Sequence, residues 1–260
     1  SPIGRNPNVM RIERARSAEQ SEVLHGRGVD MIKAVIFDID NTLYSYEHSH
    51  EYGMRSLAAY CNRVFGVSEE ETEACYKRAN KIMMDRIGSE TAAIHNRLMR
   101  MQCMLELWDK PLFPHTVNMY DRYWNASIEH SLISPGITRF MQKLKELGIR
   151  IGIGTDMTAH IQYRRLEFLN LSPYIDFIVT SEEAGVEKPT PHLFELCVEK
   201  AGVPAGECAF IGDNLTKDVK GAWDNGLKGI WYTKWIEQQE ETEYPVIRSF
   251  EEADVEEFLK

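Results

Sequence analysis

Short apolar runs alternate with amphipathic segments along most of the chain. The apolar runs lie near residues 33–37, 149–154, 175–180, 208–212 and 228–232, and each has the length of a strand that is covered on both faces. Segments of helical period separate the later runs, near 137–147, 158–169, 190–201 and 215–225. This alternation predicts an α/β fold, with a doubly wound parallel sheet between two layers of helices.

The region between the first strand and Pro135 breaks this alternation. It contains no convincing strand but four amphipathic stretches, near residues 47–65, 69–86, 90–107 and 115–130, which is too much chain for a simple crossover. We therefore predict a helical domain at 47–132, inserted into an α/β core formed by 31–46 and 133–260. Residues 1–30 are polar and charged, and we expect a disordered extension or tag remnant before a native start at Met31; an ordered arm is the alternative.

Composition narrows the classes of partner. The 260 residues are 43% apolar and 27% charged with a net charge of −10, which disfavours a nucleic acid polymer as partner. The five cysteines form no Cys-x-x-Cys pair, and we expect reduced thiols. No apolar run is long enough to cross a bilayer, so we expect a cytoplasmic protein without a membrane partner. The sequence leaves monomer and homodimer equally open.

Acidic residues follow the first strand in the run Asp38-Ile39-Asp40-Asn41-Thr42. Residues two apart on a strand point the same way, so Asp38 and Asp40 can face one pocket at the carboxyl edge of the sheet. Two carboxylates this close repel unless a cation lies beside them, which indicates a divalent metal. The alternative is a turn in which short polar side chains satisfy backbone groups.

A second acidic cluster follows the apolar run at 208–212. Asp213 supplies a hard oxygen ligand, and Mg²⁺ usually takes one or two carboxylates, so Asp38, Asp213 and the carbonyl of Asp40 would suffice to bind it. Asp218 lies five residues later, where a carboxylate could support the metal site or favour a helix N-terminus through the dipole. The sequence favours neither role over the other.

Two residues at further strand ends could hold phosphate. Thr155 ends the strand after the insertion, where a hydroxyl and free backbone amides can bind phosphate oxygens, although Asp156 could simply cap the next helix. Lys188 lies in a loop after the run at 175–180, where it could act as a point charge for phosphate. A loop lysine is more often only solvated.

Together these motifs resemble one family. The pattern Asp38-x-Asp40-x-Thr42, Thr155, Lys188-Pro189 and Gly212-Asp213-x₄-Asp218 resembles the haloacid dehalogenase (HAD) superfamily, with a helical cap inserted after the first motif. The resemblance covers residues 33–232 and is greatest for the nucleotidase-like and sugar-phosphatase-like branches. It implies a Rossmann-like core and a hydrolase that uses magnesium.

The resemblance also implies roles for the site residues. Asp38 would attack phosphorus, and Asp40 would protonate the leaving oxygen and later activate water. The remaining roles are phosphate binding by Thr155, Asp156 and Lys188, metal binding by Asp38, Asp40 and Asp213, and support of the metal site by Asn214 and Asp218. Asp156 stands where relatives often have Asn or Ser, and it adds negative charge near the phosphate.

We therefore predict a Mg²⁺-dependent phosphatase that acts on a small phosphorylated metabolite, either a nucleoside 5′-monophosphate or a sugar or polyol phosphate. A phosphomutase on the same scaffold and a phosphorylatable receiver-like signalling module are the alternatives, and Asp40 argues against a dehalogenase. In a capped enzyme the cap selects the substrate. Its candidate contacts are His48, Arg86, His95, Arg97, Trp108 and Trp124.

Overall fold

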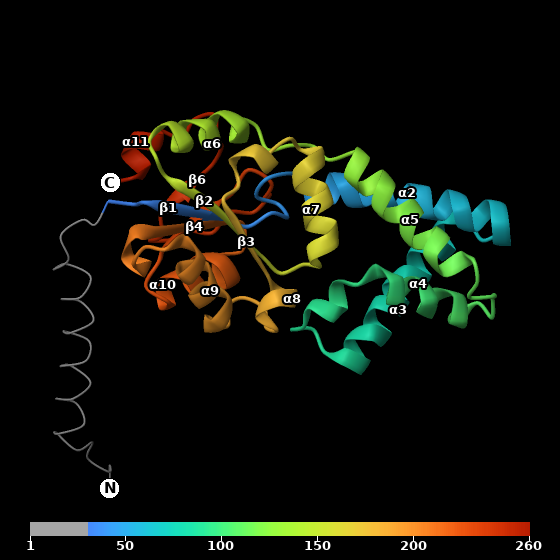
Figure 1. Ribbon diagram of the computed structural model, residues 1–260. Helices are drawn as coiled ribbons and strands as arrows, with labels where there is room; N and C mark the ends of the chain where they lie inside the picture. The colour runs from blue at the N-terminus through green and yellow to red at the C-terminus, as the bar shows by residue number, and fades with distance from the viewer. Residues whose placement is uncertain (1–30) are drawn as a thin grey trace, which may run out of the picture. The chain divides into compact units, whose positions relative to one another are not determined.

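The computed structural model describes residues 31–260, so the expectations for residues 1–30 lie outside the described part. Six parallel strands form one sheet in the order β3-β2-β1-β4-β5-β6 (Figure 1). The strands are β1 (Ala34–Phe37), β2 (Arg150–Thr155), β3 (Phe177–Thr180), β4 (Cys208–Gly212), β5 (Lys228–Tyr232) and β6 (Val246–Ile247). The parallel, doubly wound α/β sheet is confirmed.

Helices cover both faces of this sheet because its strands are apolar on both sides. In β1, Val35 and Phe37 belong to one buried cluster, while Ala34 and Ile36 belong to another. The first cluster includes side chains of α6 (Ile137–Glu146), α7 (Ala159–Phe168) and α11 (Val255–Phe258). The second includes side chains of α8 (Ser181–Ala184), α9 (Pro191–Ala201) and α10 (Gly221–Asp224). Figure 1 shows α6 and α11 on one side of the sheet and α9 and α10 on the other.

Two glycines of β2 let aromatic rings pack directly against the sheet. A Cβ at Gly152 would lie 2.2 Å from the ring of Phe177, and one at Gly154 would lie 2.7 Å from the ring of Phe210. Ile151 and Ile153 therefore pack into one buried cluster. On the opposite face of β2, the rings of Phe177 and Phe210 fill the space that side chains at Gly152 and Gly154 would occupy. Close packing of this kind tolerates no added methyl group without rearrangement.

The structure adds one strand to the predicted sheet and changes two of the predicted helices. Strand β6 was missed because two residues give no hydrophobic run. The helix expected at 90–107 is a 3₁₀ turn, η1 (Ala92–His95), followed by α4 (Arg97–Leu107), because the Asn96 side chain caps a new start. The helix expected at 215–225 begins as a π-helix, η4 (Leu215–Lys220), since the Asn214 carbonyl accepts from Asp218 and Val219. Two further 3₁₀ turns are η2 (Ser172–Tyr174) and η3 (Ala205–Glu207).

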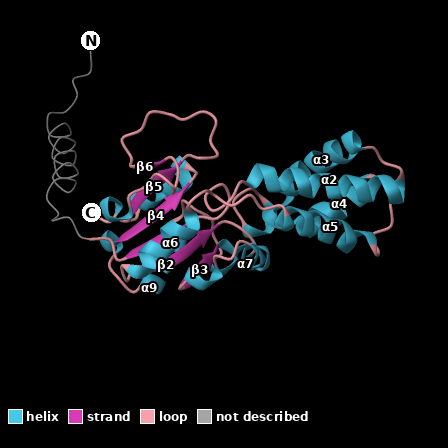
Figure 2. Cartoon of the chain, turned by 90° about the horizontal axis from the view of Figure 1, so that it is seen from above, coloured by secondary structure: helices cyan, strands magenta, loops and turns pink. Residues whose placement is uncertain are grey.

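Helices α2 (Tyr46–Phe65), α3 (Glu69–Ile87), α4 and α5 (His115–Glu129) lie side by side, and we call them the cap helices (Figure 2). They bury their own cluster, which includes Leu57, Tyr76, Met101, Tyr123 and Trp124. Serine hydroxyls cap α2 and α3, as expected for helices that begin after a loop. The domain boundary at 47–132 stays a prediction. Within residues 31–260, no helix is long and apolar enough to cross a membrane.

Candidate active site

Three predicted site residues lie where neighbouring parallel strands end. Asp38 follows β1 directly, Asp213 follows β4, and Thr155 is the last residue of β2. The ladders of β1 with β2 and β4 keep these ends level. The chain winds in opposite directions from β1, toward β2 on one side and β4 on the other, and open α/β sheets bind ligands at such a switch point.

The Lys188 side chain lies at this edge of the sheet. Its side chain is buried, and its Nζ lies 2.8 Å from Asp38 Oδ1, 2.8 Å from Asp218 Oδ1 and 3.0 Å from the carbonyl oxygen of Gly154. Burial opposes the charge on this ammonium, but Asp218 and Asp38 outweigh burial and hold the pKa of Lys188 well above its usual value. Lys188 is therefore a fixed cation and is not the solvated side chain of an ordinary loop lysine.

Three carboxylates gather around this lysine. Oxygens of Asp38, Asp213 and Asp218 all lie within 4.8 Å of one another. Burial, and then the charge of Asp218, raises the pKa of Asp213 to about 8, and burial raises the pKa of Asp38 despite the opposing charge of Lys188. A bound cation would favour the ionised form of each group, and oxygen-only ligands suit Mg²⁺. The residues present therefore fit the metal that the sequence predicts.

The structure places Asp218 inside this cluster, whereas the sequence left its role open. Its Oδ2 accepts a hydrogen bond of 3.0 Å from the amide of Asn214. A Cβ at Gly212 would lie only 2.2 Å from this oxygen, so glycine is what admits the Asp218 side chain. The Asn214 side chain points elsewhere, because its Oδ1 accepts from the amides of Thr216 and Lys217 and caps η4.

Two neutral donors bind the carboxylate of Asp40. Its Oδ1 accepts from the hydroxyl of Tyr44, and its Oδ2 accepts from Gln162 Nε2 at 2.9 Å. The same Gln162 amide donates to Thr155 Oγ1 at 2.9 Å. Thr155 is fully buried and does not line the cavity described below, so its phosphate-binding role stays a prediction.

Asp156 positions the loop that carries Lys188. Its Oδ1 accepts from the backbone amide of Lys188 at 2.9 Å, and its Oδ2 lies 3.6 Å from the ammonium of Lys217. Burial raises the pKa of the Asp156 carboxyl, although both lysines oppose this. The negative charge that this residue brings to the pocket is therefore offset by Lys217, which the sequence had not singled out.

A cavity of about 470 Å³ opens over these groups. Its wall includes Asp38, Asp40, Asp156, Lys188, Asp213, Asn214 and Asp218 from the sheet side and Tyr46, His95, Arg97 and Arg100 from the cap side. A hydrogen bond also joins the two sides, because His95 Nε2 lies 2.5 Å from Glu187 Oε1. Of the six cap candidates, only His95 and Arg97 reach the cavity. Trp124 is core, Trp108 bonds to Glu71, and neither His48 nor Arg86 lines the wall.

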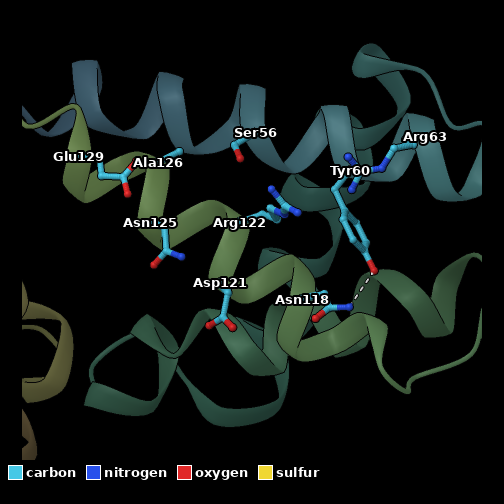
Figure 3. A pocket seen from close by; sticks show the side chains of 9 residues that line it. All are labelled: Ser56, Tyr60, Arg63, Asn118, Asp121, Arg122, Asn125, Ala126 and Glu129. Carbon is cyan, nitrogen blue, oxygen red and sulfur yellow. Dashed lines mark hydrogen bonds between the residues drawn. The ribbon is translucent and has the colours of Figure 1, made fainter.

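A second hollow lies between α2 and α5, with a volume of about 590 Å³ (Figure 3). Its wall is formed by Ser56, Tyr60, Arg63, Asn118, Asp121, Arg122, Asn125, Ala126 and Glu129. Figure 3 shows side chains of both charge signs spread along the two helices, with one hydrogen bond drawn between Asn118 and Tyr60. None of the predicted site residues lines this hollow, so the chemistry belongs to the first cavity.

Comparison with known proteins agrees with this geometry. Residues 32–225 match the family described as haloacid dehalogenase-like hydrolase. The chain belongs to this family. It is 32% identical over 203 residues to ribulose-1,5-bisphosphate 5-phosphatase of Halopiger xanaduensis, covering 78% of this chain and 85% of that protein. It is 28% identical over 236 residues to glyceraldehyde 3-phosphate phosphatase of Methanocaldococcus jannaschii, covering 88% and 99% of the two chains.

Solved structures show the same fold. The crystal structure of a HAD phosphatase from Thermococcus onnurineus superposes with a TM-score of 0.65 at 24% identity, covering 85% of this chain and 95% of that one. The predictions of a HAD hydrolase and of its α/β core are confirmed.

Several residues near the site of this haloacid dehalogenase-like hydrolase were not singled out from the sequence, and four of them have a clear place in it. Tyr44 and Gln162 hold Asp40, and Lys217 and Arg100 line the cavity. Only Arg100 had an available signal, because it lies three residues after the candidate Arg97 and so shares its face of a helix.

Proposed function

We propose that this hydrolase removes phosphate from a small phosphomonoester through an aspartyl-phosphate on Asp38, with Mg²⁺ bound. One observation carries the proposal. The Asp38 carboxylate faces a cavity, 2.8 Å from a buried ammonium, within a carboxylate cluster that fits a divalent cation. A carboxylate so placed is a nucleophile whose target can be held by positive charge.

The reaction would proceed in two displacements at phosphorus. An oxygen of Asp38 forms a bond to phosphorus while the bond to the leaving oxygen breaks, and Asp40 gives its proton to that oxygen. Asp40 then takes a proton from a water molecule, which attacks phosphorus and releases phosphate from Asp38. The hydrogen bonds from Tyr44 and Gln162 orient Asp40 for these transfers.

Positive charge would hold the phosphoryl oxygens during both steps. Lys188 is already fixed beside Asp38, and we assign it this role together with the backbone at Asp156. Mg²⁺ held by Asp38, Asp213 and the carbonyl of Asp40, with Asp218 in support, would offset the negative charge that accumulates around phosphorus.

For the substrate we propose a sugar or polyol phosphate first and a nucleoside 5′-monophosphate second. Two of the similar proteins are named as phosphatases of phosphorylated sugars, which supports this order. A cavity of about 470 Å³ suits ligands of this size. We also propose that the enzyme acts in the cytoplasm, because its five cysteines are buried and unpaired.

The test is phosphate release from a panel of both substrate classes, with Mg²⁺ or with EDTA. We expect turnover that needs the metal and falls at least about 1,000-fold in Asp38→Asn. The matched control is Asp85→Asn, which changes an exposed carboxylate on α3 and should leave the rate unchanged.

Other products would favour the alternatives. An isomerised phosphate ester, seen by phosphorus NMR in place of free phosphate, would indicate a phosphomutase. A long-lived phosphoprotein without turnover would indicate a receiver-like module. Turnover that persists in Asp38→Asn would refute the nucleophile assignment.

A further inference from the structure

Two arginines of α4 line the same cavity as the reactive groups. Arg97 and Arg100 are three residues apart and so lie on one face of the helix. Their side chains are buried, with only 5% and 6% of the residue surface exposed. Side chains of this type are rarely buried unless they are paired.

Neither guanidinium has a carboxylate partner within residues 31–260. Arg97 donates to the hydroxyl of Tyr46 at 3.1 Å, and Arg100 donates to the hydroxyl of Tyr76 at 2.8 Å. Each also donates to a backbone carbonyl, and the Nε–H group of each has no hydrogen-bond partner. Burying two like charges without a counterion is unfavourable, and an anion bound in the cavity would relieve this cost.

The other cations of the cavity are already neutralised. Lys188 lies 2.8 Å from two carboxylates, and Lys217 lies 3.2 Å from Glu187 and 3.6 Å from Asp156. The cavity therefore has one region of mixed charge around the lysines and one region at α4 whose positive charge has aromatic and hydroxyl contacts but no carboxylate partner among the described residues. An anion that binds at α4 displaces no existing ion pair.

We propose that the substrate carries a second anionic group, a phosphate or a carboxylate, and that Arg97 and Arg100 bind it while Asp38 attacks the first phosphate. The inference rests on the proposed function and narrows it to substrates with negative charge at both ends. Planar guanidinium groups suit both anions, because each presents paired N–H donors to two oxygens.

Pairs of substrates that differ by one anionic group distinguish binding of a second anion from binding of the reacting phosphate. Ribulose 1,5-bisphosphate and ribulose 5-phosphate differ by a second phosphate, and 6-phosphogluconate and sorbitol 6-phosphate differ by a carboxylate. We expect kcat/KM of the intact enzyme to be at least about 10-fold higher for the doubly anionic member of one pair or both. The pair that shows the preference identifies the second anion.

The variants Arg97→Met and Arg100→Met should each lower this kcat/KM preference about 10-fold, mainly by raising KM for the doubly anionic substrate. Arg97→Lys should restore part of the preference. Arg78→Met, which changes an exposed arginine on α3, should leave the ratio unchanged. If the intact enzyme shows no preference, or if the α4 variants lower both members of each pair equally, the proposal is overturned. An equal loss would mean that these arginines bind the reacting phosphate.

Calorimetric titration of Asp38→Asn with the same pairs keeps the inference testable without turnover. Tighter binding of the doubly anionic member, lost when Arg97→Met is added, would support the arginine site. Such binding by a wild-type enzyme that hydrolyses no phosphomonoester would reject the proposed function and retain the binding site. Equal binding of both members would reject the site itself, whatever the rates.

Discussion

His50 gives the structure a measurable dependence of stability on pH. This residue of α2 lies among the cap helices, where its Nδ1 is 2.7 Å from the hydroxyl of Tyr123. Burial, followed by the charges of Arg97 and Arg100, lowers the pKa of His50 from 6.5 to about 4. The folded protein therefore keeps this imidazole neutral across most of the mildly acidic range.

Other charged groups near His50 only adjust this value. Glu73 of α3 acts in the opposite direction and raises the pKa of His50, while Lys77 of the same helix lowers it further. The ring also stacks on Tyr46, with 5.6 Å between centroids. None of these reverses the effect of burial and of the two arginines.

The sign follows from proton uptake. Above pH 6.5, His50 is neutral in both states and costs nothing. Between pH 6.5 and about 4, the unfolded chain binds a proton that the folded protein refuses, so the free energy of unfolding falls as the pH falls. At about 1.4 kcal/mol per pKa unit, the full loss is roughly 3 kcal/mol by pH 4.

Urea unfolding at a series of pH values between 4 and 8, followed by tryptophan fluorescence, measures this loss. Carboxyl groups also titrate here, so the informative quantity is the difference between the wild type and His50→Gln. We expect that difference to change by roughly 3 kcal/mol over the window, whereas His192→Gln, an exposed site on α9, should follow the wild type. Parallel curves for wild type and His50→Gln, or an NMR titration of His50 near 6.5, would refute the reasoning.

Three further substitutions probe the catalytic edge. Lys188→Met removes the ammonium beside Asp38 and should lower kcat/KM by about 100- to 1,000-fold, so near-normal turnover would exclude its role. Gly212→Ala places a Cβ 2.2 Å from Asp218 Oδ2 and should weaken Mg²⁺ activation and cost about 1–3 kcal/mol in denaturant unfolding; unchanged values would show that the side chain can move away. Gln162→Leu frees Asp40 and should lower kcat about 10- to 100-fold with an altered pH profile, and a change in KM alone would contradict this.

The sequence predicted best what local pattern determines. Asp38 and Asp213 follow short apolar runs with the length and composition of buried strands, so their place at the sheet edge follows from the alternation of elements. The cap helices were predicted for the same reason, since helical periodicity persists through residues 47–130. The split at Asn96 was missed because a cap in mid-helix leaves the apolar period almost intact.

The sequence could not predict what tertiary packing decides. Apart from the Lys188-Pro189 motif of the family, nothing local distinguishes Lys188 from a solvated loop lysine, because its burial depends on Asp38 and Asp218, which come from two other segments. Gln162 meets Asp40 across 122 positions of sequence, through the packing of α7 against the sheet edge. Likewise, the packing of the four cap helices decides which face of α4 points into the cavity.

The chain passes from the sheet to the cap helices and back through two segments, residues 43–45 and 132–134, which are hydrogen-bonded to each other. The amide of Ser45 donates to the carbonyl of Leu132 at 2.9 Å, Tyr44 pairs antiparallel with Ile133, and the amide of Ser134 donates to the carbonyl of Leu43 at 2.8 Å. The insertion therefore begins and ends at one point, as a loop does at the tip of a hairpin. We expect a two-residue turn between Ser45 and Leu132 to close the chain there, because the two ends of the insertion already meet through backbone hydrogen bonds, so the cap helices form a unit that could be removed or replaced as a whole at this junction.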